Sequence, residues 1–297
     1  MGKKGKKAQT GKEKKVTFKD VSKKLDRLVK DLEEELQGAD LFQPLPPTED
    51  CPICCIPLSR LSYNFQYYSC CGKRICTGCV AENEAHLATE NEKRAAKDKP
   101  PLPDACPFCR SVPNNISAEQ LRRQFETRAQ NKDATACMCL AMEHVNGSDT
   151  YPKDDPKAIG YLVQAVELGS ADACHQISLF YSKGVILPVD VFRHRLFEQV
   201  GALRGCIQSR HMIGDYEYKA RACEKAICHW KIAAEAGNQQ SLNKLKTIFN
   251  ANGKLPGKEF ISKDEMDKLY RVCYVAQLEV QSGSREKRRV DPDDMRC

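Results

Sequence analysis

The chain has 297 residues, of which 41% are hydrophobic and 7% aromatic, and its formal net charge is +7. This length predicts more than one compact unit, each with a modest core. The sequence contains no uncharged apolar run of about 18 residues and no apolar stretch near its start. We therefore expect a cytoplasmic protein that neither spans a membrane nor is secreted.

The positive charge is concentrated in residues 1–15, which hold seven lysines and one glutamate. Because the rest of the chain is almost neutral, we do not expect nucleic-acid binding. Lysine clusters near a terminus are either solvated and disordered or read by nuclear importers. We interpret residues 1–15 as a basic disordered tail, with nuclear import as the alternative.

Residues 16–37 predict one amphipathic helix, since apolar residues recur at steps of three and four from Phe18 to Leu36. The pattern covers fewer than three heptads, so it fits a short coiled coil and a helix docked on its own chain equally well. The prolines of "FQPLPP" exclude a helix there because proline lacks the amide donor. We assign residues 38–50 to a linker.

The chain holds 17 cysteines, nine of them between Cys51 and Cys109. In a reducing compartment such a number indicates metal ligands and buried thiols rather than disulfides. The other eight are scattered over helical patterns, and we expect them to be core residues.

Residues 51–112 form a cysteine-rich block in which paired cysteines recur. Zinc prefers four thiolate or imidazole donors in a tetrahedron, and a Cys-x-x-Cys turn brings two sulfurs to a suitable separation. Eight donors therefore predict two zinc ions. The donors are Cys51, Cys54, Cys70, Cys71, Cys76, Cys79, Cys106 and Cys109.

The stretches "CPIC", "CCGKRICTGC" and "CPFCR" resemble the RING finger family. The resemblance implies interleaved ligand sets, with Cys51, Cys54, Cys76 and Cys79 on one ion and Cys70, Cys71, Cys106 and Cys109 on the other. Lys73 stands where members usually carry a ligand histidine, and a protonated amine has no lone pair, so Cys70 would replace it in an all-cysteine variant. Cys55 would permit a shifted assignment. His86 is a further candidate, which we interpret as a surface residue.

By resemblance, such a module has no nucleophile and holds a charged ubiquitin-conjugating enzyme in its reactive arrangement. The family contacts fall on Ile53, Pro107 and Arg110, although these residues could also close the small core, shape a turn or be solvated. Asn83 departs from the large apolar residue that many members carry at its position. This departure weakens the expected contact.

From Ser117 onward the chain predicts helices, and their pattern repeats. Aligning "QAVELGSADA", "QVGALRGCIQS" and "KIAAEAGNQQS" gives steps of 36 and 32 residues. Such periods predict a solenoid of helical hairpins. Glycine would end the second helix of each hairpin, and a small residue four positions later would let the next helix pack closely. The columns are Gly169, Gly205 and Gly237, then Ala173, Ser209 and Ser241.

The stretches "KAIGYLVQAVELGSADA" and "KAICHWKIAAEAG" resemble the Sel-one-like repeats, a family related to the tetratricopeptide repeat. Residues 117–282 then form three units and a final hairpin, although the third unit lacks the usual glycine-rich loop. Residues 283–297 are a charged tail. The expected fold class is mainly α, with a small zinc-bound RING-like ββα module followed by an α-helical-hairpin solenoid.

Two functional hypotheses follow. In the first, the chain is a RING-type ubiquitin-protein ligase that recruits a charged ubiquitin-conjugating enzyme and binds a protein substrate or adaptor on its repeats, with no catalytic residue of its own. In the second, it is a non-catalytic scaffold in which zinc only stabilises a small fold. Ile53, Pro107 and Arg110 favour the first hypothesis, and Asn83 favours the second.

Overall fold

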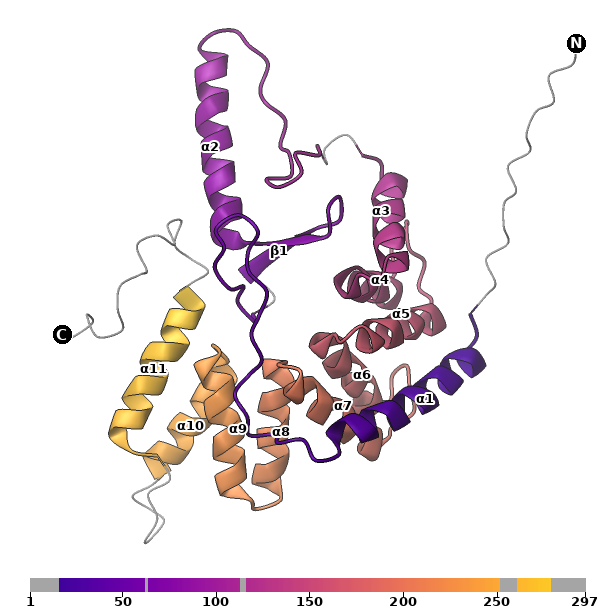
Figure 1. Cartoon of the computed structure of the whole chain (residues 1–297), viewed down its shortest axis with the longest axis vertical. Helices are drawn as coiled ribbons and strands as arrows, with labels where there is room; N and C mark the ends of the chain where they lie inside the picture. Colours follow the sequence, from indigo (N-terminus) through magenta and orange to yellow (C-terminus); the bar gives the residue numbers. More distant parts are fainter. Residues whose placement is uncertain (1–15, 62–63, 113–115, 252–260, 279–297) are drawn as a thin grey trace, which may run out of the picture.

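The computed structural model describes residues 16–61, 64–112, 116–251 and 261–278. The two charged tails predicted at the ends of the chain lie outside these residues. The described fold is mainly α, as predicted, with a small ββα block before a row of helical hairpins (Figure 1). Its elements are α1 (Phe18–Leu36), β1 (Phe65–Tyr68), β2 (Lys73–Cys76), α2 (Thr77–Ala95), α3 (Ala118–Gln130), α4 (Ala134–Asn146), α5 (Asp155–Glu167), α6 (Ala171–Lys183), α7 (Val191–Leu203), α8 (Ile207–Lys219), α9 (Cys223–Glu235), α10 (Gln239–Ala251) and α11 (Lys263–Leu278).

The hairpins α4–α5, α6–α7, α8–α9 and α10–α11 follow one another in an arc, with α3 in front of them. Gly169, Gly205 and Gly237 follow α5, α7 and α9 with φ of 88°, 102° and 96°, a conformation that glycine adopts without strain. The small residues four positions later are fully buried. The solenoid predicted from the repeat columns is thus present.

Helix α1 is docked on its own chain. A capping box between Thr17 and Asp20 begins the helix. Its apolar stripe lies against α5 and α7 and belongs to the main core of the solenoid. The buried residues of the stripe are Val21, Leu25, Leu28, Val29 and Leu32. Of the two arrangements that the sequence allowed, the structure therefore shows intramolecular docking.

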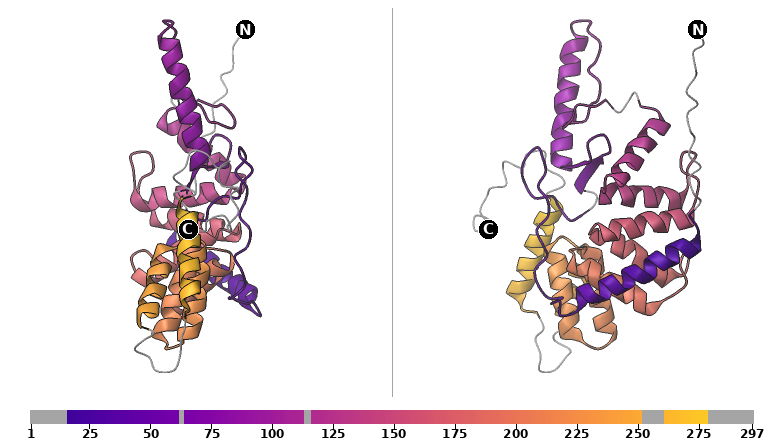
Figure 2. Two further views of the ribbon diagram at one scale, coloured as in Figure 1. Left: turned by 90° about the vertical axis from the view of Figure 1, so that its left-hand side faces the viewer. Right: turned by 45° about the vertical axis from the view of Figure 1, so that its right-hand side comes forward.

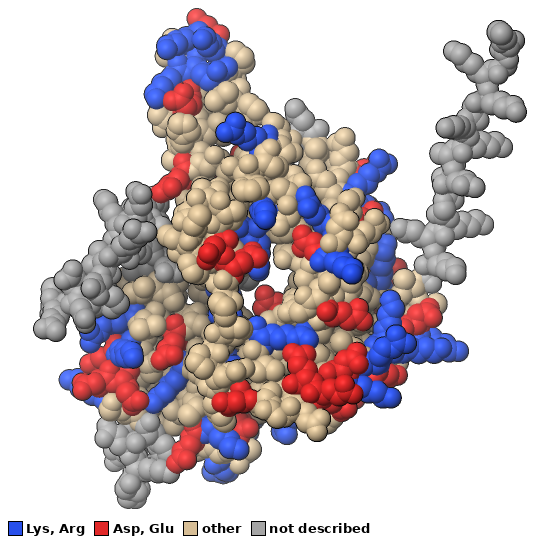
Figure 3. Space-filling model, viewed as in Figure 1, with Lys and Arg blue, Asp and Glu red and all other residues tan. Residues whose placement is uncertain are grey.

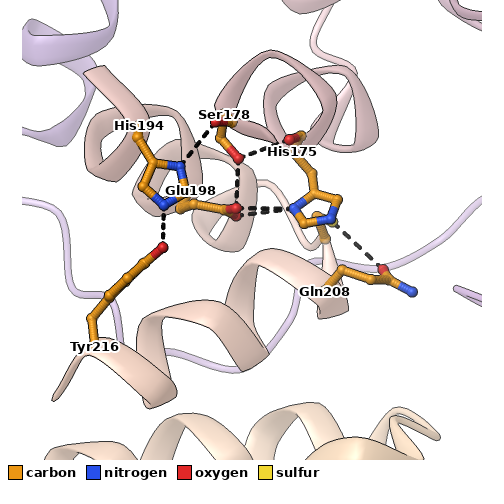
Figure 4. Close-up of polar contacts among 7 residues, drawn as sticks. His175, Ser178, His194, Glu198, Gln208 and Tyr216 are labelled. Atoms are coloured by element: carbon orange, nitrogen blue, oxygen red, sulfur yellow. Dashed lines mark hydrogen bonds and ion pairs between the residues drawn. The ribbon is translucent and has the colours of Figure 1, made fainter. Parts of the chain in front are cut away.

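A buried polar cluster joins α6, α7 and α8 (Figure 4). Glu198 has no exposed surface, accepts a hydrogen bond from the Ser178 hydroxyl at 2.5 Å, and lies 3.1 Å from Nδ1 of His175. Glu198 stands seven residues before Gly205. The residues seven positions before the corresponding glycines of the neighbouring repeats are Leu162 and Trp230, and both lie in the core. A carboxylate thus replaces an apolar residue in one repeat, and its neighbours satisfy it with hydrogen bonds.

The block containing β1, β2 and α2 lies beside the solenoid, and α2 projects away from it (Figure 2). Lys and Arg side chains gather at the free end of α2 (Figure 3). None of the helices in the described ranges has the length and apolar character needed to cross a bilayer.

The scattered cysteines are only partly core residues. Cys137, Cys174, Cys206 and Cys273 are buried, as expected. Cys228 is exposed, so the prediction is wrong for this residue. Cys228 lies on α9 outside the buried residues of that helix.

Candidate metal centre

The first cysteine quartet joins an N-terminal turn to the β-hairpin and α2. Cys51 and Cys54 lie in the turn, Cys76 ends β2, and Cys79 lies in the first turn of α2. The Sγ atoms of Cys51 and Cys79 are 3.9 Å apart, and those of Cys54 and Cys76 are 3.8 Å apart. A tetrahedral zinc with Zn–S bonds of about 2.3 Å separates its sulfurs by about 3.8 Å. The donor set and its spacing therefore fit one zinc ion.

The second quartet is formed by Cys70, Cys71, Cys106 and Cys109, whose Sγ atoms all lie within 4.8 Å of one another. Cys71 is 3.8 Å from Cys106, and Cys109 is 3.4 Å from Cys70. Adjacent cysteines thus point into the same site. The two quartets have the interleaved membership that the resemblance implied, and four thiolates again suit a zinc ion.

Lys73 is not positioned as a metal ligand. Its Nζ lies over the Phe108 ring, 5.8 Å from the centroid. Cys55 is exposed and belongs to neither quartet, and His86 is exposed on α2. The described structure therefore favours the all-cysteine arrangement over the shifted one.

The two Cys-x-x-Cys turns outside the β-hairpin share one backbone geometry. The N–H of Cys55 donates to the carbonyl of Cys51, and that of Arg110 donates to Cys106, both at 2.9 Å. Cys55 and Arg110 have φ of 56° and 58°, a region that non-glycine residues rarely adopt. In both turns the hydrogen bond from this left-handed residue closes the backbone around the two sulfurs.

The thiols of the first quartet differ in the direction in which the fold shifts their pKa. Burial acts to raise the pKa of the Cys51 thiol, but the N–H groups of Cys54, Cys76 and Ile53 outweigh it and lower the pKa to about 7. Burial raises the pKa of the Cys79 thiol. Four thiolates in one place repel one another, so the quartet requires a bound cation to become fully deprotonated.

The residues predicted to contact a conjugating enzyme lie on the surface of the cysteine turns. Ile53 is 43% exposed and is absent from the small core of the block, which contains Leu58 and Ile75. Pro107 is partly buried, and Arg110 is exposed. The structure therefore excludes core closure as the role of Ile53.

Phe108, which sequence reasoning did not select, is also 45% exposed. The signal was available in "CPFCR", because the middle residues of a Cys-x-x-Cys turn face away from the sulfurs. Asn83 is partly buried on α2. Phe108 thus supplies exposed aromatic surface, whereas Asn83 supplies no large apolar side chain.

Side chains of α3 and its following turn hold the block against the solenoid. Arg128 donates from Nη2 to the Cys70 carbonyl at 2.8 Å and from Nε to the Ser69 carbonyl at 3.2 Å. The Tyr67 hydroxyl donates to Asp133 at 2.7 Å. Between block and solenoid lies a cavity of about 310 Å³ lined by both polar and apolar residues, and Figure 3 shows an opening in this face of the molecule.

Fold and site together define a helical-repeat protein with two cysteine quartets that could each hold a metal ion. No family model matches the chain, and no curated protein matches it. Among solved structures, it is similar to a Sel1 repeat protein from Oxalobacter formigenes, with 27% identity and a TM-score of 0.46 over 54% of this chain and 65% of that one.

It is also similar to a protective antigen of uropathogenic Escherichia coli strains that displays an SLR fold, with 20% identity and a TM-score of 0.44 over 65% of this chain. A third structure, Pseudomonas aeruginosa 5086, has 12% identity and a TM-score of 0.31. The chain spans 65% and 38% of the length of the first two.

Proposed function

We propose that this chain is a RING-type ubiquitin-protein ligase that binds two zinc ions and carries Sel-one-like repeats. The observation that supports this best is the pair of interleaved cysteine quartets, whose turns expose Ile53 and Arg110. The zinc block recruits a charged ubiquitin-conjugating enzyme and acts by orientation, without a nucleophile of its own. We place this activity in the cytoplasm.

The contact surface has an apolar and a cationic part. Ile53 and Pro107 offer apolar area to the conjugating enzyme, with Phe108 as an addition. Arg110 presents a guanidinium that can donate several hydrogen bonds to both the enzyme and ubiquitin. Because these residues are carried by metal-bound turns, zinc would fix their positions before the partner arrives.

The experiment is discharge of ubiquitin from a panel of charged conjugating enzymes onto free lysine, with zinc content measured for every protein used. The native chain should accelerate discharge. Ile53→Ala should abolish most of the acceleration while keeping both zinc ions, because Ile53 lies outside the core of the block. Gln66→Ala, an exposed residue of β1, is the matched control.

Absence of stimulation across the panel with both zinc ions bound would favour the second candidate, a non-catalytic scaffold. Asn83 is the observation that supports it, since this polar residue replaces apolar contact area. In both cases we propose that the solenoid binds a protein substrate or adaptor.

A further inference from the structure

Residues 37–47 connect α1 to the cysteine-rich block and run over α8 and α9 (Figure 1). In the described part of the chain, no backbone hydrogen bond joins residues 40–47 to another element. Leu41 and Phe42 contact the solenoid, Leu41 through its carbonyl on Arg210 and Phe42 through its ring on His229. A segment held in this way opens more easily than a helix with five buried apolar residues, such as α1.

Arg210 of α8 lies beneath this segment and has no exposed surface. Its Nη1 donates to the Leu41 carbonyl and its Nη2 to the Ala202 carbonyl at 2.8 Å. Its Nε has no hydrogen-bond partner among the described residues, and no described carboxylate forms an ion pair with it. A buried guanidinium is ordinarily paired with an anion, because burying an unpaired charge is unfavourable.

His229 of α9 lies under the same segment and is 1% exposed. Phe42 stacks on its ring, with centroids 4.7 Å apart and planes inclined by 25°. Nδ1 of His229 also lacks a hydrogen-bond partner among the described residues. Burial and the nearby Arg210 charge lower the pKa of His229 to about 4, so the ring is neutral near pH 7.

Residues 37–47, which cover Arg210 and His229, satisfy the hydrogen-bonding and charge requirements of these two side chains only in part. Its carboxylate, Asp40, accepts a hydrogen bond from the Phe42 N–H at 2.8 Å. Asp40 raises the pKa of Arg210, against the larger effect of burial, yet makes no ion pair with it. The segment thus supplies an aromatic ring and a carbonyl but leaves a buried cation without its counterion.

We propose that Arg210 and His229 form a recognition site for an acidic peptide of a partner protein. A carboxylate of the peptide pairs with Arg210, and an adjacent apolar side chain replaces Phe42 on the His229 ring. Residues 40–42 of this chain, Asp-Leu-Phe, occupy the site as an intramolecular stand-in. This inference rests on the proposed function in one respect, that the solenoid binds a partner, and it specifies the chemistry of that partner.

The probe is a fluorescein-labelled peptide of residues 37–46, QGADLFQPLP, with both ends blocked. It is titrated against the full-length chain and followed by fluorescence anisotropy. The native chain should bind it weakly, because the tethered segment competes at an effective concentration of about millimolar. Phe42→Ala weakens this competitor and should increase the affinity about fivefold or more.

Two controls isolate the site. Phe18→Ala removes an exposed aromatic residue of α1, and this variant should bind like the native chain. The free peptide is not tethered, so under the proposal its Asp carboxylate reaches Arg210, which the tethered Asp40 does not. The same peptide with Asn in place of its Asp loses this charge-assisted pair and should bind the Phe42→Ala chain about tenfold more weakly.

Arg210→Met in the Phe42→Ala background should abolish binding, provided that its circular dichroism matches that of the parent. Hydrogen exchange provides a test that needs no change at Arg210. Peptide binding to the Phe42→Ala chain should slow amide exchange in α8 and α9 and leave α1 unchanged.

The proposal is overturned if Phe42→Ala binds the probe no better than the native chain, or if the Asp-to-Asn peptide binds equally well. It is also overturned if Phe42→Ala forms a dimer on gel filtration that the probe does not dissociate, because the occupant is then a second copy. Ubiquitin discharge is measured separately. Its absence would leave the peptide site standing, and a failed peptide titration would leave the ligase proposal standing.

Discussion

Glu35 of α1 and Arg204 at the end of α7 form a two-point ion pair, with Nε–Oε1 of 2.9 Å and Nη2–Oε2 of 2.6 Å. Near the start of α7, the Arg193 guanidinium donates a hydrogen bond to the Asp26 carboxylate of α1 at 2.7 Å. The two pairs join residues 169 and 167 positions apart. Helix α1 therefore runs parallel to α7 and is clamped near both ends of it.

The Glu35–Arg204 pair should contribute measurable stability because its geometry is bidentate and both side chains are partly buried. We expect Glu35→Gln to lower the free energy of unfolding by about 1 kcal/mol, measured by urea denaturation. Glu34→Gln, next to it and exposed, is the control and should have no effect beyond experimental error. Equal effects of both variants would contradict the clamp.

The apolar stripe of α1 should be a larger source of stability. Leu25 is 2% exposed, and we expect Leu25→Ala to lower the free energy of unfolding by about 2–5 kcal/mol. Lys24→Ala, on the exposed side, is the control. The unfolding midpoint should not depend on protein concentration, because α1 docks on its own chain. A concentration-dependent midpoint would instead indicate a coiled coil between chains.

The Glu198 carboxylate should be sensitive to loss of its partner. His175→Ala removes one of its two described partners inside the solenoid, and we expect unfolding to become easier by about 3 kcal/mol. The double variant His175→Leu/Glu198→Leu should be less destabilised than His175→Ala, since the unpaired charge is then absent. Thermal and urea unfolding of the three proteins test this order.

Burial of His229 should make stability depend on pH. The pKa of His229 falls from the ordinary value of 6.5 to about 4 in the folded chain, so between these values the unfolded state binds more protons. Stability is then complete above pH 6.5 and declines as the pH falls to 4. The decline amounts to about 3 kcal/mol at most.

Urea midpoints between pH 4 and 7 should therefore change less in His229→Gln than in the native chain. His86→Gln alters an exposed histidine and should keep the native profile. Burial also lowers the pKa of His144 and His211, so a smaller dependence of the same sign should remain in His229→Gln. Superimposable profiles of His229→Gln and the native chain would refute the prediction.

Cys54→Ser should remove one metal ion and spare the solenoid. Two zinc ions per chain should fall to one, because the first quartet loses a thiolate. The helical circular dichroism should stay close to native, since metal binding stabilises the small block and the solenoid has its own core. Cys55→Ser, an exposed cysteine outside both quartets, is the control. Unchanged zinc content in Cys54→Ser would contradict the assignment.

Local sequence patterns determined the parts of this protein that depend on near neighbours. Cysteine spacing predicted eight donors for two metal ions, because each Cys-x-x-Cys turn forms within four residues, whereas their division into two quartets was implied by the resemblance to RING fingers. Gly169, Gly205 and Gly237 predicted the repeat boundaries, because a left-handed residue ends a helix locally. The pattern predicted helices from Ser117 onward, and a capping box between Ser117 and Gln120 begins α3 there, with both hydrogen bonds present.

Only the tertiary structure decided which surfaces meet. Periodicity shows that α1 has an apolar face but does not encode that Glu35 pairs with Arg204. Such a contact depends on how the cysteine-rich block and the helices α3 to α6 between them are arranged. The same holds for Arg210 beneath Leu41 and for Lys73 over Phe108. Hydrophobic burial is non-directional, so the sequence specifies that these faces are covered, and the packing of the whole chain determines what covers them.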